Sequence, residues 1–129
     1  MGFHFLSNDW FQEVKRLRED AGDLGVPEDL MKLTINIRVT GGPDGEKKLH
    51  LKGGTIYQGK ADLAATNITI TYDLARKVLL ENDLSAVMKG MATRKVKVKG
   101  DLTKMMALQN ITSNESVQSL MGKVLEMTD

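Results

Sequence analysis

Apolar positions repeat along this chain with two different periods, and each change of period predicts a boundary between helix and strand. Apolar residues three or four positions apart predict helices over residues 7–22, 73–83, 84–93, 102–110 and 113–127. Alternation predicts strands over 32–40, 46–52, 67–72 and 94–100, and an irregular strand over 55–65. The order predicts one α+β domain over residues 1–129, with a five-stranded, mostly antiparallel sheet covered on one face by helices.

The first helix and the first strand show the clearest local signals. We expect Ser7 to cap the helix, because its hydroxyl can accept a hydrogen bond from an amide two or three residues on. In the strand, apolar and polar residues occupy opposite faces. The apolar face holds Leu33, Ile35, Ile37 and Val39, and the polar face holds Thr34, Asn36, Arg38 and Thr40. Gly53 and Gly54 predict a tight turn between the second and third strands.

The composition narrows the classes of function. The formal net charge is +1, which gives no overall attraction to nucleic acid or to anionic lipid. Cysteine is absent, which excludes disulfides, thiolate nucleophiles and zinc–thiolate sites and is typical of a reducing compartment. No secretory segment is visible, and no apolar run approaches the ~20 residues of a membrane-spanning helix. We therefore expect a cytoplasmic protein.

No catalytic constellation stands out. The two histidines, His4 in a terminal arm and His50 on the polar face of a strand, are interpreted as solvated side chains. The carboxylates are scattered, and the glycine pairs lack a phosphate-binding pattern. The sequence therefore predicts no enzyme activity, no cofactor and no metal site. The basic run at residues 94–99 is interpreted as the solvated face of a strand, and only 5% of the chain is aromatic, so no nucleic-acid partner is predicted.

The methionines leave two interpretations open. Six of the 8 lie in the last third, on predicted helices: Met88, Met91, Met105, Met106, Met121 and Met127. Methionine is flexible and polarizable, so it either fills gaps in an ordinary core or lines a surface that accepts several shapes. Several short apolar helices over one sheet face can also leave an apolar cavity between them.

A family resemblance favours the cavity. Residues 66–111 contain Thr69-Ile70-Thr71, then Asp73 opening a helix, then a methionine-glycine helix over 88–91. The segment 97–101 ends a strand in Gly-Asp, and Leu108-Gln109 ends the following helix. In this order and spacing the chain resembles the sterol carrier protein 2 domain family, in a stand-alone bacterial or archaeal form. The match is firm over 66–111 and extends over about 7–127.

The resemblance implies a hydrophobic tunnel that holds a fatty acid, acyl-CoA, sterol or similar lipid without covalent chemistry. The strand 94–100 would then contribute to the tunnel floor, and the helix after residue 101 to its wall. The predicted lining residues are Ile35, Ile37, Ile68, Ile70, Leu80, Leu84, Val87, Met88, Met91, Val96, Val98, Leu102, Met105, Met106, Leu120, Met121 and Val124.

The last predicted helix leaves a second pair of alternatives. Its apolar stripe either docks permanently or opens as a lid that makes transient contact with a membrane or a protein. The expected partner is a lipid or fatty acyl ligand. The alternative function is an accessory or regulatory module that uses the same fold to dock a partner protein.

Overall fold

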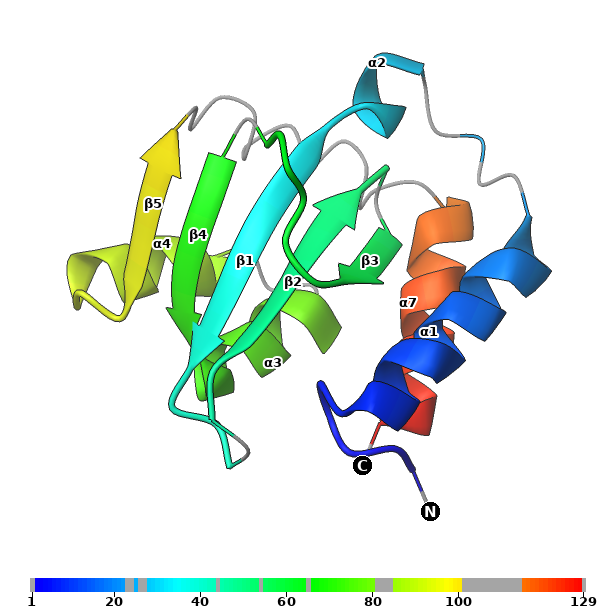
Figure 1. Ribbon diagram of the computed structural model, residues 1–129, viewed down its shortest axis with the longest axis horizontal. Helices are drawn as coiled ribbons and strands as arrows, with labels where there is room; N and C mark the ends of the chain where they lie inside the picture. The colour runs from blue at the N-terminus through cyan, green and yellow to red at the C-terminus, as the bar shows by residue number, and fades with distance from the viewer. Residues whose placement is uncertain are drawn as a thin grey trace.

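A five-stranded sheet forms the centre of the computed structural model. The structure describes residues 2–22, 25, 28–43, 45–53, 55–64, 66–80, 85–100 and 115–128, and of residues 29 and 30 only the backbone. The spatial order of its strands is β3-β2-β1-β4-β5 (Figure 1). The strands are β1 (Thr34–Thr40), β2 (Lys47–Lys52), β3 (Thr55–Gln58), β4 (Thr66–Thr71) and β5 (Val96–Gly100).

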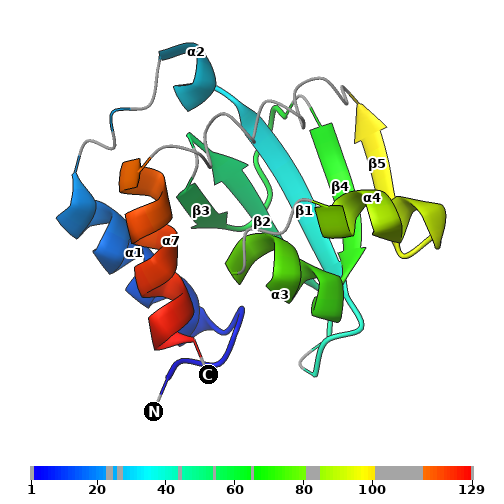
Figure 2. The same cartoon turned by 180° about the vertical axis from the view of Figure 1, so that it is seen from behind.

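The described helices lie over one face of this sheet and beside its β3 edge, with one short helix at the end of β1. They are α1 (Asn8–Ala21), the short α2 (Glu28–Met31), α3 (Tyr72–Leu80), α4 (Ser85–Ala92) and α7 (Glu115–Met127). Helices α3 and α4 lie behind the strands in Figure 1 and in front of them in Figure 2, while α1 and α7 lie side by side next to β3. We call the side that carries α3 and α4 the inner face and the opposite side the outer face. The predicted α+β class, with helices over one face, is confirmed.

The two central strands run parallel. Strand β1 pairs with β4 in parallel register, with Ile37 beside Ile68, whereas β1–β2, β2–β3 and β4–β5 are antiparallel. After β3, the segment 59–64 crosses back over the outer face before β4 begins (Figure 1). This crossing lets β4 start at the same end of the sheet as β1, which a hairpin could not do. The sheet is therefore mixed, although most of its pairings are antiparallel as predicted.

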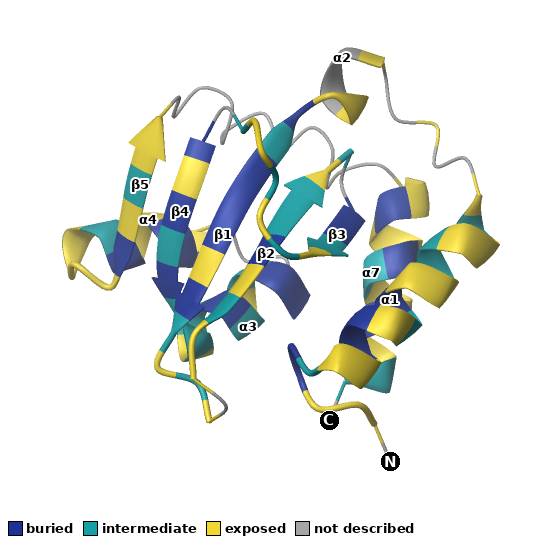
Figure 3. Cartoon of the chain, in the orientation of Figure 1, coloured by how far each residue is buried: buried dark blue, intermediate teal, exposed yellow. Residues whose placement is uncertain are grey.

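The core lies between the inner face and the helices. Alternate residues of β4 are buried, as are Ile35, Ile37 and Val39 of β1, and the buried bands on the strands and on α7 are visible in Figure 3. Helix α1 starts as predicted, because the Ser7 hydroxyl accepts a hydrogen bond from the Trp10 amide at 3.1 Å. Trp10 itself is completely buried, with Phe5 and Phe11 edge-on against its ring.

Two local features differ from the sequence prediction. The third strand ends at Gln58, where the sequence predicted strand through residue 65, because Gly59 (φ +88°) turns the chain out of the sheet. Asn36 lies on the polar face of the strand as predicted, but it is only 7% exposed. Its side chain accepts from the Ala61 amide at 2.8 Å and donates to the Ala61 carbonyl and to Asn67 Oδ1, each at 3.1 Å. These bonds hold the crossing segment against the outer face.

Candidate functional site

The apolar residues of the inner face come together as one buried cluster. It includes eight of the predicted lining residues: Ile35, Ile37, Ile68, Ile70, Leu80, Val87, Val96 and Val124. Leu120 is also buried, and three further predicted residues, Met91, Val98 and Met121, are half-buried against the cluster. Leu84, Leu102, Met105 and Met106 lie outside the described residues, as does the helix predicted over 102–110. The described residues thus form one apolar core between the sheet and the helices, and their role as a tunnel lining stays a prediction.

Met88 is the exception, because it is 56% exposed. The buried side of α4 runs through Val87 and Gly90. A Cβ at Gly90 would overlap Val96 Cγ2 and come within 2.9 Å of Leu74 Cδ1, so this side of α4 packs closely on β5 and α3. Each residue advances about 100° around a helix, which turns Met88 away from that side and leaves Met91, one turn after Val87, at its margin. Met88 therefore lies outside the buried core, and its role in lining a tunnel stays a prediction.

The buried core on the inner face contains few polar side chains. Among the described residues, the buried polar ones are Asn36, Thr55 and Thr66, and none of them is charged. Asn36 belongs to the outer face, and the Thr55 hydroxyl donates to the Lys52 carbonyl at 3.0 Å. No buried side-chain nitrogen or oxygen in the described ranges lacks a hydrogen-bond partner. Because a buried polar group needs a partner, this interior suits a hydrocarbon chain and would exclude a charged head group.

Helix α7 is docked on this core. Val117, Leu120 and Val124 are buried, and α7 packs against both α1 and α3. The end of the helix is tied to the start of the chain, since the Phe3 amide donates to the Met127 carbonyl at 2.6 Å. The docked arrangement is one of the two alternatives that the sequence left open, and movement of α7 as a lid remains a prediction.

The histidines occupy different environments. His4 is exposed, as predicted. His50 is half-buried and stacks on Tyr57, with ring centroids 5.1 Å apart. Its Nδ1 lies 2.9 Å from the Gly59 carbonyl oxygen, which can only accept, so Nδ1 carries the proton. The prediction of a solvated His50 was wrong because the turn at Gly59 folds back over β2. Within the described ranges no three metal-ligating side chains come together.

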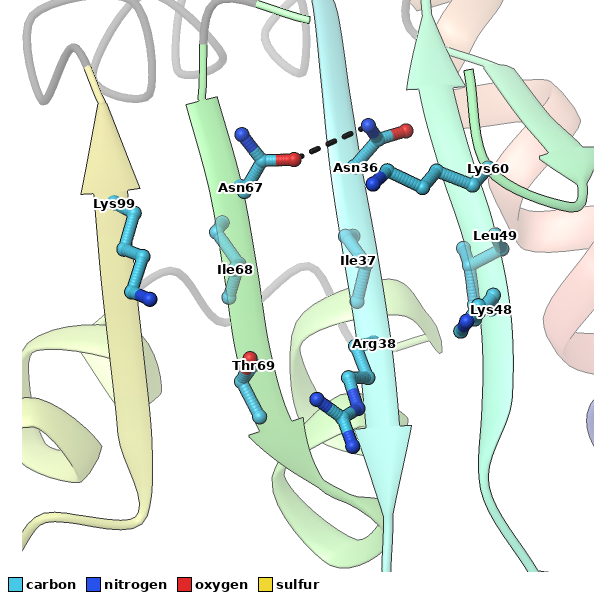
Figure 4. A pocket seen from close by; sticks show the side chains of 10 residues that line it. All are labelled: Asn36, Ile37, Arg38, Lys48, Leu49, Lys60, Asn67, Ile68, Thr69 and Lys99. Atoms are coloured by element: carbon cyan, nitrogen blue, oxygen red, sulfur yellow. Dashed lines mark hydrogen bonds between the residues drawn. The ribbon is translucent and has the colours of Figure 1, made fainter. Parts of the chain in front are cut away.

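A hollow lies on the outer face. It has a volume of about 290 Å³ and is lined by strand residues and by Lys60 of the crossing segment (Figure 4). Its cations are Arg38, Lys48, Lys60 and Lys99, and Asn36, Asn67 and Thr69 contribute neutral polar groups. Ile37 and Ile68, predicted for the tunnel, also contribute to its floor. We call this hollow the outer pocket, and its lining differs in character from the apolar interior.

Comparisons with solved structures identify the architecture. The sequence matches no protein-family model, and a search of curated proteins finds no significant match. The fold, however, is similar to sterol carrier protein 2 from Yarrowia lipolytica in its apo form, with a TM-score of 0.52, 18% identity and 84% of each chain covered. It is similar to the sterol carrier protein domain 2 of Helicoverpa armigera, with a TM-score of 0.53, 16% identity, and 98% of this chain and 95% of that one covered.

This chain has the sterol carrier protein 2 fold. A third similar structure is sterol carrier protein 2 from Aedes aegypti in complex with the C16 fatty acid palmitate, with a TM-score of 0.53 and 19% identity over 88% of this chain and 100% of that one. At these identities the likeness establishes the sterol carrier protein 2 fold alone. None of the helices within the described ranges has the length and apolar character needed to cross a membrane.

Proposed function

We propose that this protein is a non-enzymatic lipid carrier that holds a fatty acid, acyl-CoA, sterol or similar ligand in an apolar tunnel between the inner face and the helices. One observation carries the proposal. The buried residues described on the inner side are apolar or neutral and hydrogen-bonded, in a fold for which a palmitate complex has been solved. Such an interior can take up a hydrocarbon chain, and its described buried residues include no charged group for acid–base or nucleophilic chemistry.

The lining supports a fatty acyl chain as the first ligand to test. Burying each CH₂ group contributes about 0.8 kcal/mol, so a long chain gains affinity without any specific polar contact. Met91 and Met121 are half-buried at the margin of the core. Flexible thioether side chains at such positions adapt to chains of different shape. We place the carboxylate of a fatty acid toward solvent, because none of the described buried residues is charged.

Native mass spectrometry of the purified protein, together with extraction and identification of any bound lipid, tests the proposal. We expect co-purified lipid at one molecule per chain. After lipid is removed, a series of saturated fatty acids should bind more tightly as the chain lengthens, by up to about fourfold per added CH₂. A protein that carries no lipid, binds no member of the series and has a fully packed interior would contradict the proposal. A stable complex with another protein would then favour the regulatory alternative.

A further inference from the structure

The outer pocket brings together cations whose positions sequence alone does not reveal. Arg38 of β1 and Lys48 of β2 are directly opposite in the antiparallel register, with both side chains on the outer face. Like charges placed opposite each other destabilise a sheet. Positive charge on an edge strand protects against aggregation, but β1 and β2 both lie inside the five-strand order. Edge protection therefore explains Lys99 on β5 but not Arg38 and Lys48, of which Arg38 is also paired with Glu46.

Lys60 reaches the same place by a different route. It belongs to the crossing segment, which the Asn36–Ala61 hydrogen bonds hold on the outer face. Figure 4 shows the Lys60 side chain extending toward Asn36, and the Lys99 side chain reaching from β5 toward β4. Four cations from three strands and one connecting segment therefore line a single hollow.

The neutral groups of the outer pocket are complementary to an anion as well. Asn36 donates to Asn67 Oδ1, which leaves the Asn67 amide nitrogen as a donor. The Thr69 hydroxyl is a further donor beside Arg38 in the β1–β4 register. No carboxylate lines the pocket in the part of the chain that the structure describes. Glu46 pairs with Arg38 from outside the lining, with Arg38 Nη2 3.0 Å from Glu46 Oε2, so it offsets part of the charge.

We propose that the outer pocket binds a phosphate group of a small soluble molecule. Lysine and arginine supply the charge, and the Asn67 amide and Thr69 hydroxyl supply directed hydrogen bonds to phosphate oxygens. Its volume of about 290 Å³ suits a phosphate or diphosphate with a small substituent. A nucleic acid strand is a poorer fit, because Tyr57, the aromatic residue on the outer side of β3, is already stacked against His50 and lies 3.9 Å from the Arg18 guanidinium.

The probe is inorganic pyrophosphate, titrated into ¹⁵N-labelled protein in 150 mM NaCl and followed by NMR. We expect saturable shifts of the Asn67 side-chain amide and of the Thr69 and Lys99 backbone amides. The double variant K60Q/K99Q should weaken pyrophosphate binding by about tenfold, since each exposed charge contributes roughly two- to fivefold. The charge-matched control K77Q/K123Q changes two exposed lysines on α3 and α7 and should leave the affinity unchanged. E46Q should strengthen binding about twofold, because it releases Arg38.

Two further binding experiments distinguish a small soluble phosphate from a phosphate on a lipid or on a nucleic acid. The first measures binding to phosphatidic acid vesicles against phosphatidylcholine vesicles, and the second measures binding to a short single-stranded oligonucleotide. Binding of pyrophosphate that K60Q/K99Q weakens and K77Q/K123Q does not supports the pocket. Equal losses in both double variants, or binding to vesicles or oligonucleotide without saturable pyrophosphate shifts, would overturn it. Fatty acid binding should be the same in all these variants, because the pocket and the apolar interior lie on opposite faces of the sheet.

Discussion

The indole N–H of Trp10 donates a 2.8 Å hydrogen bond to the hydroxyl of Thr128, 118 residues later in the chain. The Thr128 hydroxyl in turn donates to the Val124 carbonyl. Trp10 is fully buried, so its N–H depends on this one acceptor beside α7. The bond therefore joins the first helix to the end of the last one and holds α7 over the core.

Replacing Thr128 tests how firmly α7 is held. T128V keeps the shape of the side chain but removes the acceptor, and leaving a buried donor without a partner costs about 1–3 kcal/mol. We expect T128V to lower the free energy of unfolding by an amount near the low end of that range, because Thr128 is half-exposed and water can reach the indole N–H. T128S keeps the hydroxyl and should behave like the parent in urea unfolding.

The same pair of variants distinguishes a lid from a fixed helix. If α7 opens to admit ligand, T128V should release a bound fatty acid faster than T128S in a stopped-flow displacement assay. A reduced stability with an unchanged release rate would show that α7 completes the core and does not gate it.

Replacing the helical glycines Gly90 and Gly122 with alanine should have opposite effects on stability. At Gly90 a Cβ would overlap Val96 Cγ2 and approach Leu74 Cδ1, so G90A should destabilise the protein by about 1–3 kcal/mol through overpacking. At Gly122, in α7, no atom lies within 4 Å of the same position, so G122A should stabilise by up to about 1 kcal/mol. Urea unfolding of both variants measures the contrast. A destabilising G122A or a neutral G90A would contradict the packing of α4 and α7 described here.

Two methionines on α4 offer a matched test of the tunnel. Met91 is half-buried against the core, whereas Met88 is 56% exposed on the same helix. M91W should lower the occupancy of a fatty acid several-fold while changing stability by less than the ~1–3 kcal/mol that overpacking a full core costs. M88W adds the same ring at the exposed position and should change neither quantity. If M91W unfolds the protein and the parent binds no lipid, the residues around Met91 are ordinary core.

Glu46 gives a prediction about pH. The hydrogen bond from Arg38, followed by the charges of Arg38 and Lys48, holds the pKa of the Glu46 carboxyl below its ordinary value. A carboxyl whose pKa is lower in the folded state stabilises the fold above the unfolded pKa, and this contribution disappears as the pH falls through the folded pKa. Because Glu46 is exposed, we expect a small effect on stability. An NMR titration of the Glu46 side chain should show the lowered pKa in the parent and a return toward the ordinary value in R38Q.

Local signals were sufficient for much of the fold. The Ser7 cap and the alternation from Leu33 to Val39 depend on residues only a few positions apart, and the structure agrees with both. The burial of Asn36 was not predicted, because its partners, Ala61 and Asn67, lie 25 and 31 residues away. Strand alternation alone cannot indicate that a later segment crosses the polar face. The parallel pairing of β1 with β4 was missed for the same reason.

The candidate sites were likewise predictable only where they depend on local sequence patterns. The apolar interior could be outlined from periodicity, because inward-facing strand residues become core wherever the helices pack. The predicted lining included both Met88 and Met91, but Gly90 packs closely on Val96, so the buried side of α4 leaves Met88 exposed. The outer pocket could not be predicted without the sheet register, which places Arg38 opposite Lys48, and the crossing segment, which adds Lys60 to the same lining. In the sequence each of these cations looks like an ordinary solvated residue.

The parallel pair at the centre of the sheet also sets the order in which the protein can fold. Strands β1, β2 and β3 pair through neighbours in sequence, so this half of the sheet can form early. Strand β1 then keeps one edge unpaired until β4 arrives from beyond the crossing. An unpaired edge that carries Ile35, Ile37 and Val39 is a template for pairing with another chain. Aggregation during refolding should therefore compete with the pairing of β1 and β4. Any change that slows the placement of the crossing segment should increase aggregation.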